Sequence, residues 1–156
     1  MQTAYFKTPI GIAKIIGNKQ GITEISIQEQ AEVSIEIPDD LQNAVLQIND
    51  YFERKTTQFT FAINPKGTQF QQKVWHELLT IPFGKTMSYL ELSKKLGDVK
   101  AIRAVASANG KNPLWIVVPC HRIIGSDGSL TGYAGGLWRK KWLLEHENST
   151  KQQSLF

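Results

Sequence analysis

Residues 88–110 read SYLELSKKLGDVKAIRAVASANG, and this stretch decides the fold of the second half of the chain. Ser88 and Glu91 stand three residues apart, as the two partners of a capping box do at the start of a helix. Gly97 interrupts the helical pattern, and a second helix is predicted over about 100–108, ended by an Asn-Gly pair. Two short helices joined by a tight turn that contains glycine match a helix-turn-helix.

The second of these helices has one side on which an arginine stands among short side chains. At 100° per residue, Arg103, Ala104 and Ser107 fall on one side, and Ile102 and Val105 on the other. Such a side could approach a groove of a nucleic acid closely. The alternative is an ordinary solvent-exposed side that lacks long side chains. We favour the groove because the surrounding sequence is basic.

The charge is distributed unevenly along the 156 residues, whose net charge is +4. Residues 85–141 contain ten basic and three acidic residues, a net charge of +7, whereas residues 1–64 contain five and eight, a net charge of −3. A basic half beside an acidic half suggests that the second half meets a polyanion. Charge alone does not distinguish this from a solvated, lysine-rich surface.

The composition narrows the class of protein further. A chain that is 41% hydrophobic and 21% charged is typical of a globular protein. One cysteine excludes an internal disulfide, and three scattered histidines give no pattern of metal ligands, so we expect neither a metal nor a cofactor. The longest strongly apolar run, residues 114–118, is far too short to span a bilayer, and no signal segment is visible. We expect a cytoplasmic protein with a free thiol.

The first half of the chain predicts a small α/β unit. Short β-type runs lie at 5–6, 10–16, 22–27 and 59–63, with a hairpin signal between the middle two. A helix opens at Pro38 and carries its apolar residues on one face: Leu41, Ala44, Val45, Ile48, Tyr51 and Phe52. This half contains no recognisable chemistry, and we interpret residues 1–65 as a scaffold domain and 66–156 as the functional domain.

Three further elements are predicted in the second half. Thr68 and Gln71 form a capping box for a helix whose predicted buried stripe is Phe70, Val74, Leu78 and Leu79. Residues 114–118 predict a short buried strand, and a glycine-rich loop follows over 125–136. The last helix is predicted from about Leu137 to Glu147, with a polar tail after it.

The candidate for chemistry is Cys120, which directly follows the predicted buried strand. A lone cysteine is most often an inert core residue. The end of a strand, however, presents side chains to a pocket, and the cations that follow Cys120 would lower the pKa of its thiol. His121 could be a structural histidine, and Glu147 lies beside an apolar helix face where a carboxylate needs a partner. A Cys-His-Glu relay is chemically sensible, although neighbours on an extended chain point apart and would need a bend or a water between them.

These motifs resemble those of the O6-alkylguanine-DNA alkyltransferases, in the short bacterial form. The resemblance rests on 119–125 (PCHRIIG), 109–113 (NGKNP), 81–86 (IPFGKT) and 131–137 (TGYAGGL), together with Gln71, Trp75, Ser88, Tyr89, Arg103 and residues 140–147. It covers about the last 85 residues of the sequence. It implies an RNase H-like α/β domain followed by a mostly α-helical domain with a winged helix-turn-helix.

The resemblance also implies a mechanism. The Cys120 thiolate would take the alkyl group from a flipped O6-alkylguanine, irreversibly and once per molecule. Glu147 and His121 would activate the thiol, Asn112 would fix its surroundings, and Tyr89 would protonate the leaving guanine and crowd a phosphate. Arg103 would fill the vacated stack from the minor groove of double-stranded DNA, beside Ala104 and Ser107, and Arg122 belongs to the predicted DNA-contacting set.

The predicted base pocket comprises Ile123, Tyr133, Ala134, Gly135 and Lys140, the last supporting Tyr89. Some relatives carry serine where Ala134 stands, so a side-chain hydrogen bond to the base would be missing here. Its absence could widen the range of substrates towards larger alkyl groups or O4-alkylthymine. Some relatives also hold an N-terminal zinc; residues 1–64 contain no cysteine or histidine, so we predict no metal. We expect a monomer with no membrane partner.

Two other functions compete with this one. The first is a DNA-binding module that flips the lesion without chemistry, but relatives of that type carry tryptophan at the position of Cys120. The second is a Cys-His hydrolase, for which the sequence offers no clear oxyanion hole.

Overall fold

In the computed structural model, which describes residues 1–130, 133 and 135–153 (149–153 by backbone alone), the chain forms two compact units. Unit 1 comprises Met1–Lys66 and the short segment Pro113–Trp115. Unit 2 comprises Gly67–Asn112 and the chain from Ile116 onward. The segment Pro113–Trp115 is therefore an insert from the second half of the sequence into the first unit.

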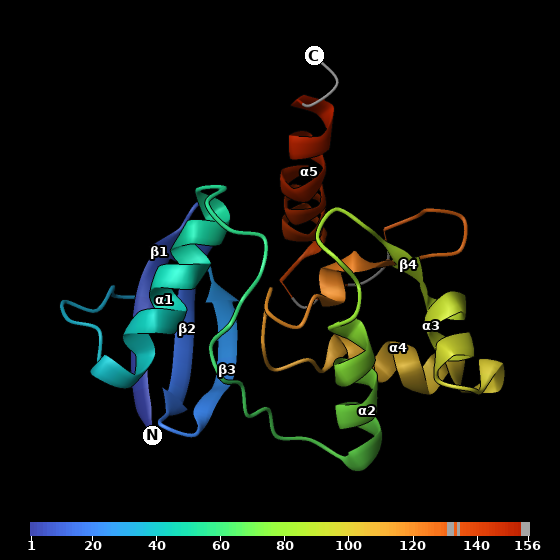
Figure 1. Ribbon diagram of the computed structural model, residues 1–156, viewed down its shortest axis with the longest axis horizontal. Coiled ribbons are helices and arrows are strands. Elements are labelled where there is room, and N and C mark those ends of the chain that lie inside the picture. Colours follow the sequence, from blue (N-terminus) through green and yellow to red (C-terminus); the bar gives the residue numbers. More distant parts are fainter. Residues whose placement is uncertain (131–132, 134, 154–156) are drawn as a thin grey trace. The chain divides into compact units, whose positions relative to one another are not determined.

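Unit 1 is built on a three-stranded antiparallel sheet in the order β1-β2-β3 (Figure 1). The strands are β1 Gln2–Thr8, β2 Gly11–Asn18 and β3 Gly21–Gln28. Side chains alternate between the two faces of the central strand β2, whose buried side chains Ala13 and Ile15 are small or β-branched. The β2–β3 hairpin that the sequence predicts is present, and it closes at Gly21, whose φ of 139° disfavours a side chain.

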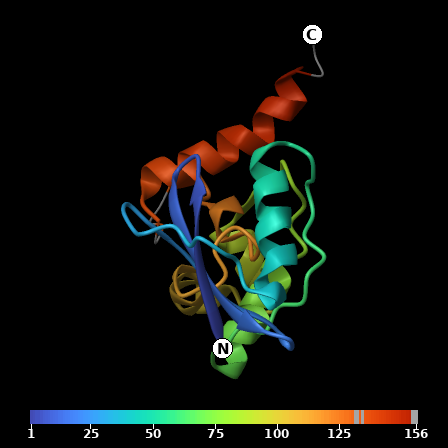
Figure 2. The same cartoon turned by 90° about the vertical axis from the view of Figure 1, so that its left-hand side faces the viewer.

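Helix α1, Asp39–Phe52, covers one face of this sheet (Figures 1 and 2). Pro38 precedes it and two aspartates occupy its first turn, where they complement the helix dipole. Its buried residues are the predicted stripe except Phe52, which is half-buried. Each large apolar side chain in that stripe stabilises the fold by about 1.5–3 kcal/mol when it is fully buried.

The predicted strand at 59–63 is wrong. Only Ile63 pairs with β3, through a single parallel bridge to Ile22, and the rest of the segment is irregular. Its aromatic residues pack instead: the Phe59 ring lies 5.6 Å from that of Tyr51 and 5.8 Å from that of Phe61. The alternating apolar residues of this segment are thus half-buried by ring packing rather than by strand pairing.

Unit 2 begins with helix α2, Gln69–Leu78, which has the predicted capping box of Thr68 and Gln71. Its buried residues are Val74, Trp75 and Leu78, and the Trp75 indole donates to the carbonyl of Ala108 at 2.8 Å. The predicted stripe is wrong at its two ends, since Phe70 and Leu79 are 38% and 44% exposed. The buried face is rotated towards Trp75, whose ring reaches the neighbouring helix.

The helix-turn-helix has the predicted order. It consists of α3 Tyr89–Lys95, the 3₁₀ turn η1 Val99–Ala101 and α4 Ile102–Gly110, grouped with α2 in Figure 1. Ser88 and Glu91 make the capping box of α3, and Gly97 has a φ of 89° in the turn. Helix α4 includes the Asn-Gly pair that was predicted to stop it. Its buried side faces α2 and α3, so the opposite side is open to solvent.

Two elements complete unit 2. A short parallel pair joins β4, Met87–Ser88, to β5, Ile123–Ile124, and so ties the start of α3 to the segment after Cys120. Helix α5, Leu137–Gln153, is longer than predicted and does not end at Glu147. In the described part of the chain, no helix has both the length and the apolar character needed to cross a membrane.

Candidate active site

The segment that leads to Cys120 is buried, but it is not the predicted strand. Residues 114–118 are all buried, yet only Leu114 makes a β-bridge, to Ile25. Ile116 turns the chain with a φ of 70°, and Pro119 (φ −81°, ψ 63°) forms an inverse γ-turn in which Cys120 N–H donates to Val118 O at 2.8 Å. A buried apolar run cannot by itself be assigned to a strand, which is why the prediction failed.

Cys120 then starts a 3₁₀ turn, η2, Cys120–Arg122. Neighbouring side chains point apart only in an extended chain, so this turn does not force His121 away from Cys120. The thiol remains largely covered, because Cys120 is 8% exposed. A tight turn rather than a strand end therefore presents the sulfur.

A buried cluster of three side chains lies next to the cysteine. His121 Nε2 lies 2.7 Å from Glu147 Oε2. Arg122 donates to the same carboxylate from Nε at 2.8 Å and from Nη2 at 3.0 Å, and from Nη1 to the carbonyl of Ile81 at 2.6 Å. The side chains of His121, Glu147 and Arg122 are 0%, 1% and 8% exposed. The two charged groups are thus paired and hydrogen-bonded, as buried charges must be.

This environment sets the protonation of the cluster. Burial alone would raise the pKa of the Glu147 carboxyl, but the hydrogen bonds and charges of His121 and Arg122 hold that pKa far below its usual range. Burial lowers the pKa of His121, against the opposing effect of Glu147. A neutral imidazole that donates from Nε2 to an ionised Glu147 keeps Nδ1 as an acceptor. His121 Nδ1 is buried and has no hydrogen-bond partner among the described residues, so it can accept a proton.

The thiol has a different environment from the one predicted. Burial raises the pKa of Cys120, while a hydrogen bond with Asn112, the charge of Lys140 and a hydrogen bond with Tyr133 act in the opposite direction. The expectation of a thiol pKa below its ordinary value is therefore wrong, because burial outweighs the lowering effect of the nearby cation. The cation that acts on the sulfur is Lys140, and burial in turn lowers the pKa of that lysine.

Asn112 also fixes the backbone at the cysteine. Its Nδ2 donates to the carbonyl of Val118 at 2.7 Å, and that carbonyl also accepts the Cys120 N–H. One side chain therefore contacts both the thiol and the turn that presents it. The structure brings four of the residues named from the sequence into one buried region with Cys120: His121, Glu147, Asn112 and Lys140. Lys140 acts on the thiol, whereas the sequence interpretation placed it in the base pocket beside Tyr89.

The predicted DNA-contacting residues divide into two groups. Arg103, Ala104 and Ser107 are exposed on α4. Tyr89 is the first residue of α3 and is half-buried. Arg122 does not belong with them: its guanidinium is buried and donates to Glu147 and Ile81, so it is not presented to a phosphate. Its function in this structure is to balance the charge of Glu147.

Part of the predicted base pocket is described. Ile123 is buried in β5, Tyr133 contacts the thiol, and the carbonyl of Gly135 accepts a hydrogen bond from Arg139 Nη1 at 2.8 Å. Ala134 lies outside the described residues. Arg139, which is buried, was missed by the sequence interpretation. The signal that the sequence offered is an arginine in the first turn of the predicted helix, where a cation is unfavourable unless it has a local partner.

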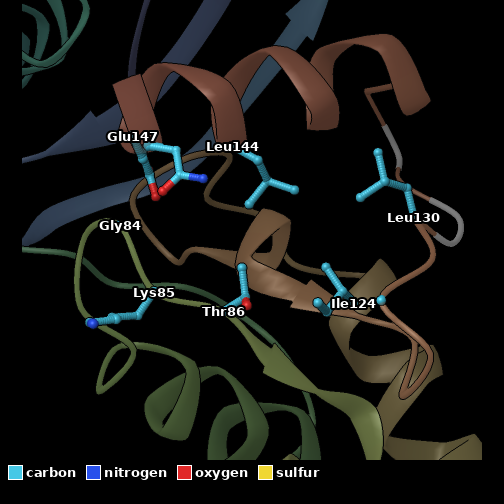
Figure 3. Close-up of a pocket in the computed structure, with 9 residues that line it drawn as sticks. Gly84, Lys85, Thr86, Ile124, Leu130, Leu144 and Glu147 are labelled. Carbon is cyan, nitrogen blue, oxygen red and sulfur yellow. The ribbon is translucent and has the colours of Figure 1, made fainter. Parts of the chain in front are cut away.

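A hollow of about 300 Å³ is lined in part by Glu147 (Figure 3). Leu144 and Glu147 of α5 form one wall, and Thr86 and Ile124 face them from the β4–β5 side. Cys120 and His121 do not line it. Among the described residues, no group of three or more His, Cys, Asp or Glu side chains is arranged to hold a metal.

The fold and the site together define a two-unit protein in which a helix-turn-helix unit carries a cysteine beside a His-Glu-Arg cluster. The model of the 6-O-methylguanine DNA methyltransferase DNA-binding domain matches residues 69–149, and that of the ribonuclease-like domain of the same family matches residues 1–65. The chain belongs to the 6-O-methylguanine DNA methyltransferase family. The predicted fold class and the predicted family are thereby confirmed.

Individual relatives agree with this assignment. The chain is 40% identical over 156 residues to a methylated-DNA–protein-cysteine methyltransferase of Methanosarcina acetivorans, covering 96% of this chain and 99% of the relative. It is 44% identical to one of Mycobacterium bovis, covering 91% and 89%. A crystal structure of Mycobacterium tuberculosis OGT in complex with DNA superposes with a TM-score of 0.85 at 44% identity, covering 94% of this chain and 92% of that one.

The raised pKa of Cys120 predicts how its reactivity depends on pH. The thiolate fraction is small at neutral pH and grows about tenfold per pH unit up to the pKa, so alkylation by iodoacetamide should accelerate in the same way from about pH 7 to 9. Intact mass spectrometry measures the rate, and the chain has no other thiol to interfere. A rate that stays flat over this range would mean a thiol already ionised at pH 7, contrary to the effect of burial.

Proposed function

We propose that this protein repairs DNA by transferring the alkyl group of O6-alkylguanine to Cys120 and keeping it there. The observation that carries the proposal is that the residue after the only cysteine, in the same buried turn, is a neutral histidine whose Nε2 is bound to the Glu147–Arg122 pair and whose Nδ1 can accept a proton. Relatives that share 40–44% of the sequence are named for this transfer.

In the proposed reaction, His121 takes the thiol proton, directly or through one water, and Cys120 Sγ attacks the alkyl carbon. The S–C bond forms as the C–O6 bond breaks, and the electron pair leaves with the guanine. Tyr89 gives a proton to the leaving base. The product is a thioether, which has no easy leaving group, so each molecule acts once. Asn112 and Lys140 stabilise the developing thiolate.

The proposed substrate is double-stranded DNA, contacted from the minor groove by α4. Arg103 would take the place of the flipped nucleotide, because it stands among short side chains on the exposed side of that helix. Tyr133, Ala134 and Gly135 with Ile123 would hold the base, and O4-alkylthymine is a second candidate substrate. In this proposal the protein acts as a monomer, with residues 1–65 as scaffold and 66–156 as the alkyltransferase domain.

Intact mass spectrometry after mixing with an oligonucleotide that contains O6-methylguanine tests the proposal. We expect the protein to gain the mass of one CH₂ group, on the peptide that contains Cys120, in an amount that never exceeds the amount of protein. Tight binding of the modified oligonucleotide without any mass gain would instead support a lesion-binding module.

Replacing Arg103 by alanine should separate the flipping of the base out of the duplex from the alkyl transfer itself. Transfer from duplex DNA requires the base to leave the stack, at a cost of a few kcal/mol, whereas free O6-benzylguanine does not. We therefore expect the variant to lose about tenfold or more on duplex DNA and little on the free base. Equal losses on both substrates would contradict the proposed role. Arg54→Ala, an exposed arginine of unit 1, is the matched control.

A further inference from the structure

Unit 1 holds a piece of the chain that belongs, by sequence, to the cysteine region. Ile25 of β3 donates its N–H to the carbonyl of Pro113 at 2.8 Å and accepts the N–H of Trp115 at 3.0 Å, so Leu114 lies parallel to β3. Leu114 is fully buried and Trp115 is 6% exposed. The Trp115 ring lies 6.2 Å from that of Phe52 on α1. Backbone pairing and ring packing thus fix the insert Pro113–Trp115 inside unit 1.

Both ends of this insert lead directly to groups at the thiol. Asn112 precedes it, and its amide donates to the carbonyl of Val118, which also accepts the Cys120 N–H. Residues 113–117 therefore form a small loop that is closed at its base by Asn112 and Val118 and held at its tip by β3. Movement of the tip would be transmitted over a few bonds to Asn112 and to the turn at Cys120.

The conformation of Ile116 indicates that the loop is held tightly. Its φ of 70° lies in the left-handed region, which a β-branched residue strongly disfavours, and the side chain is 1% exposed. Such a conformation persists only where the surrounding structure over-determines it. Here the insert fixes the chain before Ile116, and the Asn112–Val118 hydrogen bond fixes it after.

We propose that unit 1 is a positioning element for the transfer: through Ile25 and Phe52 it holds the insert, and through Ile116 the insert holds Asn112 and Cys120 in their reactive arrangement. This inference rests on the proposed function of Cys120. It assigns to the ribonuclease-like half an effect on the chemistry without contact with the substrate. None of Ile25, Phe52 and Ile116 is a catalytic residue.

The test compares Phe52→Ala with Phe59→Ala. Both phenylalanines are half-buried and pack on Tyr51, but only the Phe52 ring lies against Trp115 in the described contacts. For each variant we would measure the rate constant with free O6-benzylguanine, the affinity for an unmodified duplex, and the free energy of unfolding in urea. We expect Phe52→Ala to react about tenfold more slowly than Phe59→Ala, with the same DNA affinity, and Phe52→Leu to restore most of the rate.

Equal rates for the two alanine variants would overturn the inference while leaving the proposed function intact. If the wild-type protein took up no benzyl group, the proposed function itself would fail. The two failures are therefore distinguishable in one experiment.

A second pair of variants covers the case in which Phe52→Ala does not fold. Ile116→Gly and Ile116→Ala both remove the buried side chain, but only glycine adopts a φ of 70° without strain. We expect Ile116→Gly to be more stable than Ile116→Ala and yet to react about threefold more slowly, because a freer backbone loosens the cysteine turn. A glycine variant that reacts at least as fast as the alanine variant would contradict the proposal.

Discussion

Replacing Cys120 by alanine is expected to abolish alkyl transfer and leave the affinity for duplex DNA unchanged within about twofold. Cys120 holds the only thiol of the chain, and the proposed reaction forms its new bond at that sulfur. The side chain is buried and small, so its loss leaves at most a minor cavity and costs about 1 kcal/mol of stability. The exposed side of α4, which would contact DNA, is untouched.

Cys120→Ser is the companion variant that separates shape from chemistry. Serine fills nearly the same volume and can keep the hydrogen bond of Asn112, but a buried hydroxyl is hardly ionised at neutral pH and is a weak nucleophile. We expect it to bind duplex DNA and to transfer alkyl groups orders of magnitude more slowly. Transfer would be followed by intact mass and binding by fluorescence anisotropy. Full methyl transfer by the alanine variant would refute the assignment of the acceptor.

The sequence predicted the elements that carry their own local signals. Both capping boxes, Thr68/Gln71 and Ser88/Glu91, mark helix starts correctly, because the residues that cap a helix also begin it. The exposed side of α4 followed from helical geometry alone. The family resemblance rested on an ordered series of motifs rather than on one, and it gave the correct fold class.

The errors in predicted secondary structure lie in apolar segments that pack against the fold without adopting the extended conformation of a strand. The apolar runs at 59–63 and 114–118 read as strands, but tertiary packing bends one around aromatic rings and turns the other at Ile116. No local feature of the sequence predicts the left-handed conformation of Ile116. The contacts that hold the residues just before it come from β3, about ninety residues earlier in the chain.

The candidate site was predicted by residue type better than by electrostatics. The structure places His121 against Glu147 and Asn112 against the Cys120 thiol, whereas Arg122, which was assigned to the DNA, is buried against Glu147. The expected direction of the Cys120 pKa shift was wrong. Both errors have one cause: the sequence shows that charges are near in the chain but not that they are buried. The need for charge balance could have pointed to Arg122, since a buried Glu147 requires a cation.

Removing the carboxylate of Glu147 is expected to be the most destabilising single change in unit 2. In Glu147→Leu the Arg122 guanidinium would stay buried with one partner, Ile81, and without a counter-charge, at a cost of about 3–5 kcal/mol. A domain of this size has a total stability of only about 5–15 kcal/mol, so this loss would shift the urea midpoint strongly. Glu147→Gln should lose less, because its amide oxygen still accepts a hydrogen bond from Arg122.

The double variant Arg122→Met/Glu147→Leu distinguishes charge pairing from packing. Removing both charges together leaves no buried ion unpaired, so we expect the double variant to recover most of the stability that Glu147→Leu loses. Its transfer rate should stay about a hundredfold below wild type, because His121 has lost the acceptor that fixes its Nε2 proton and leaves Nδ1 as the base. The double variant would thus recover stability without recovering activity.

The pH dependence of unfolding adds an independent check on the same carboxylate. Its pKa is depressed in the folded protein, so its contribution to stability is fully present above the pKa of an unfolded glutamate, about 4.3, and is lost as the pH falls below that value. The difference in unfolding free energy between wild type and Glu147→Leu should therefore shrink as the pH falls from about 5 towards 3. A difference that stays constant over this range would mean that the pKa of the carboxyl is the same in the folded and unfolded protein, so that His121 and Arg122 do not stabilise its ionised form. The proposed orientation of His121 would then lose its support.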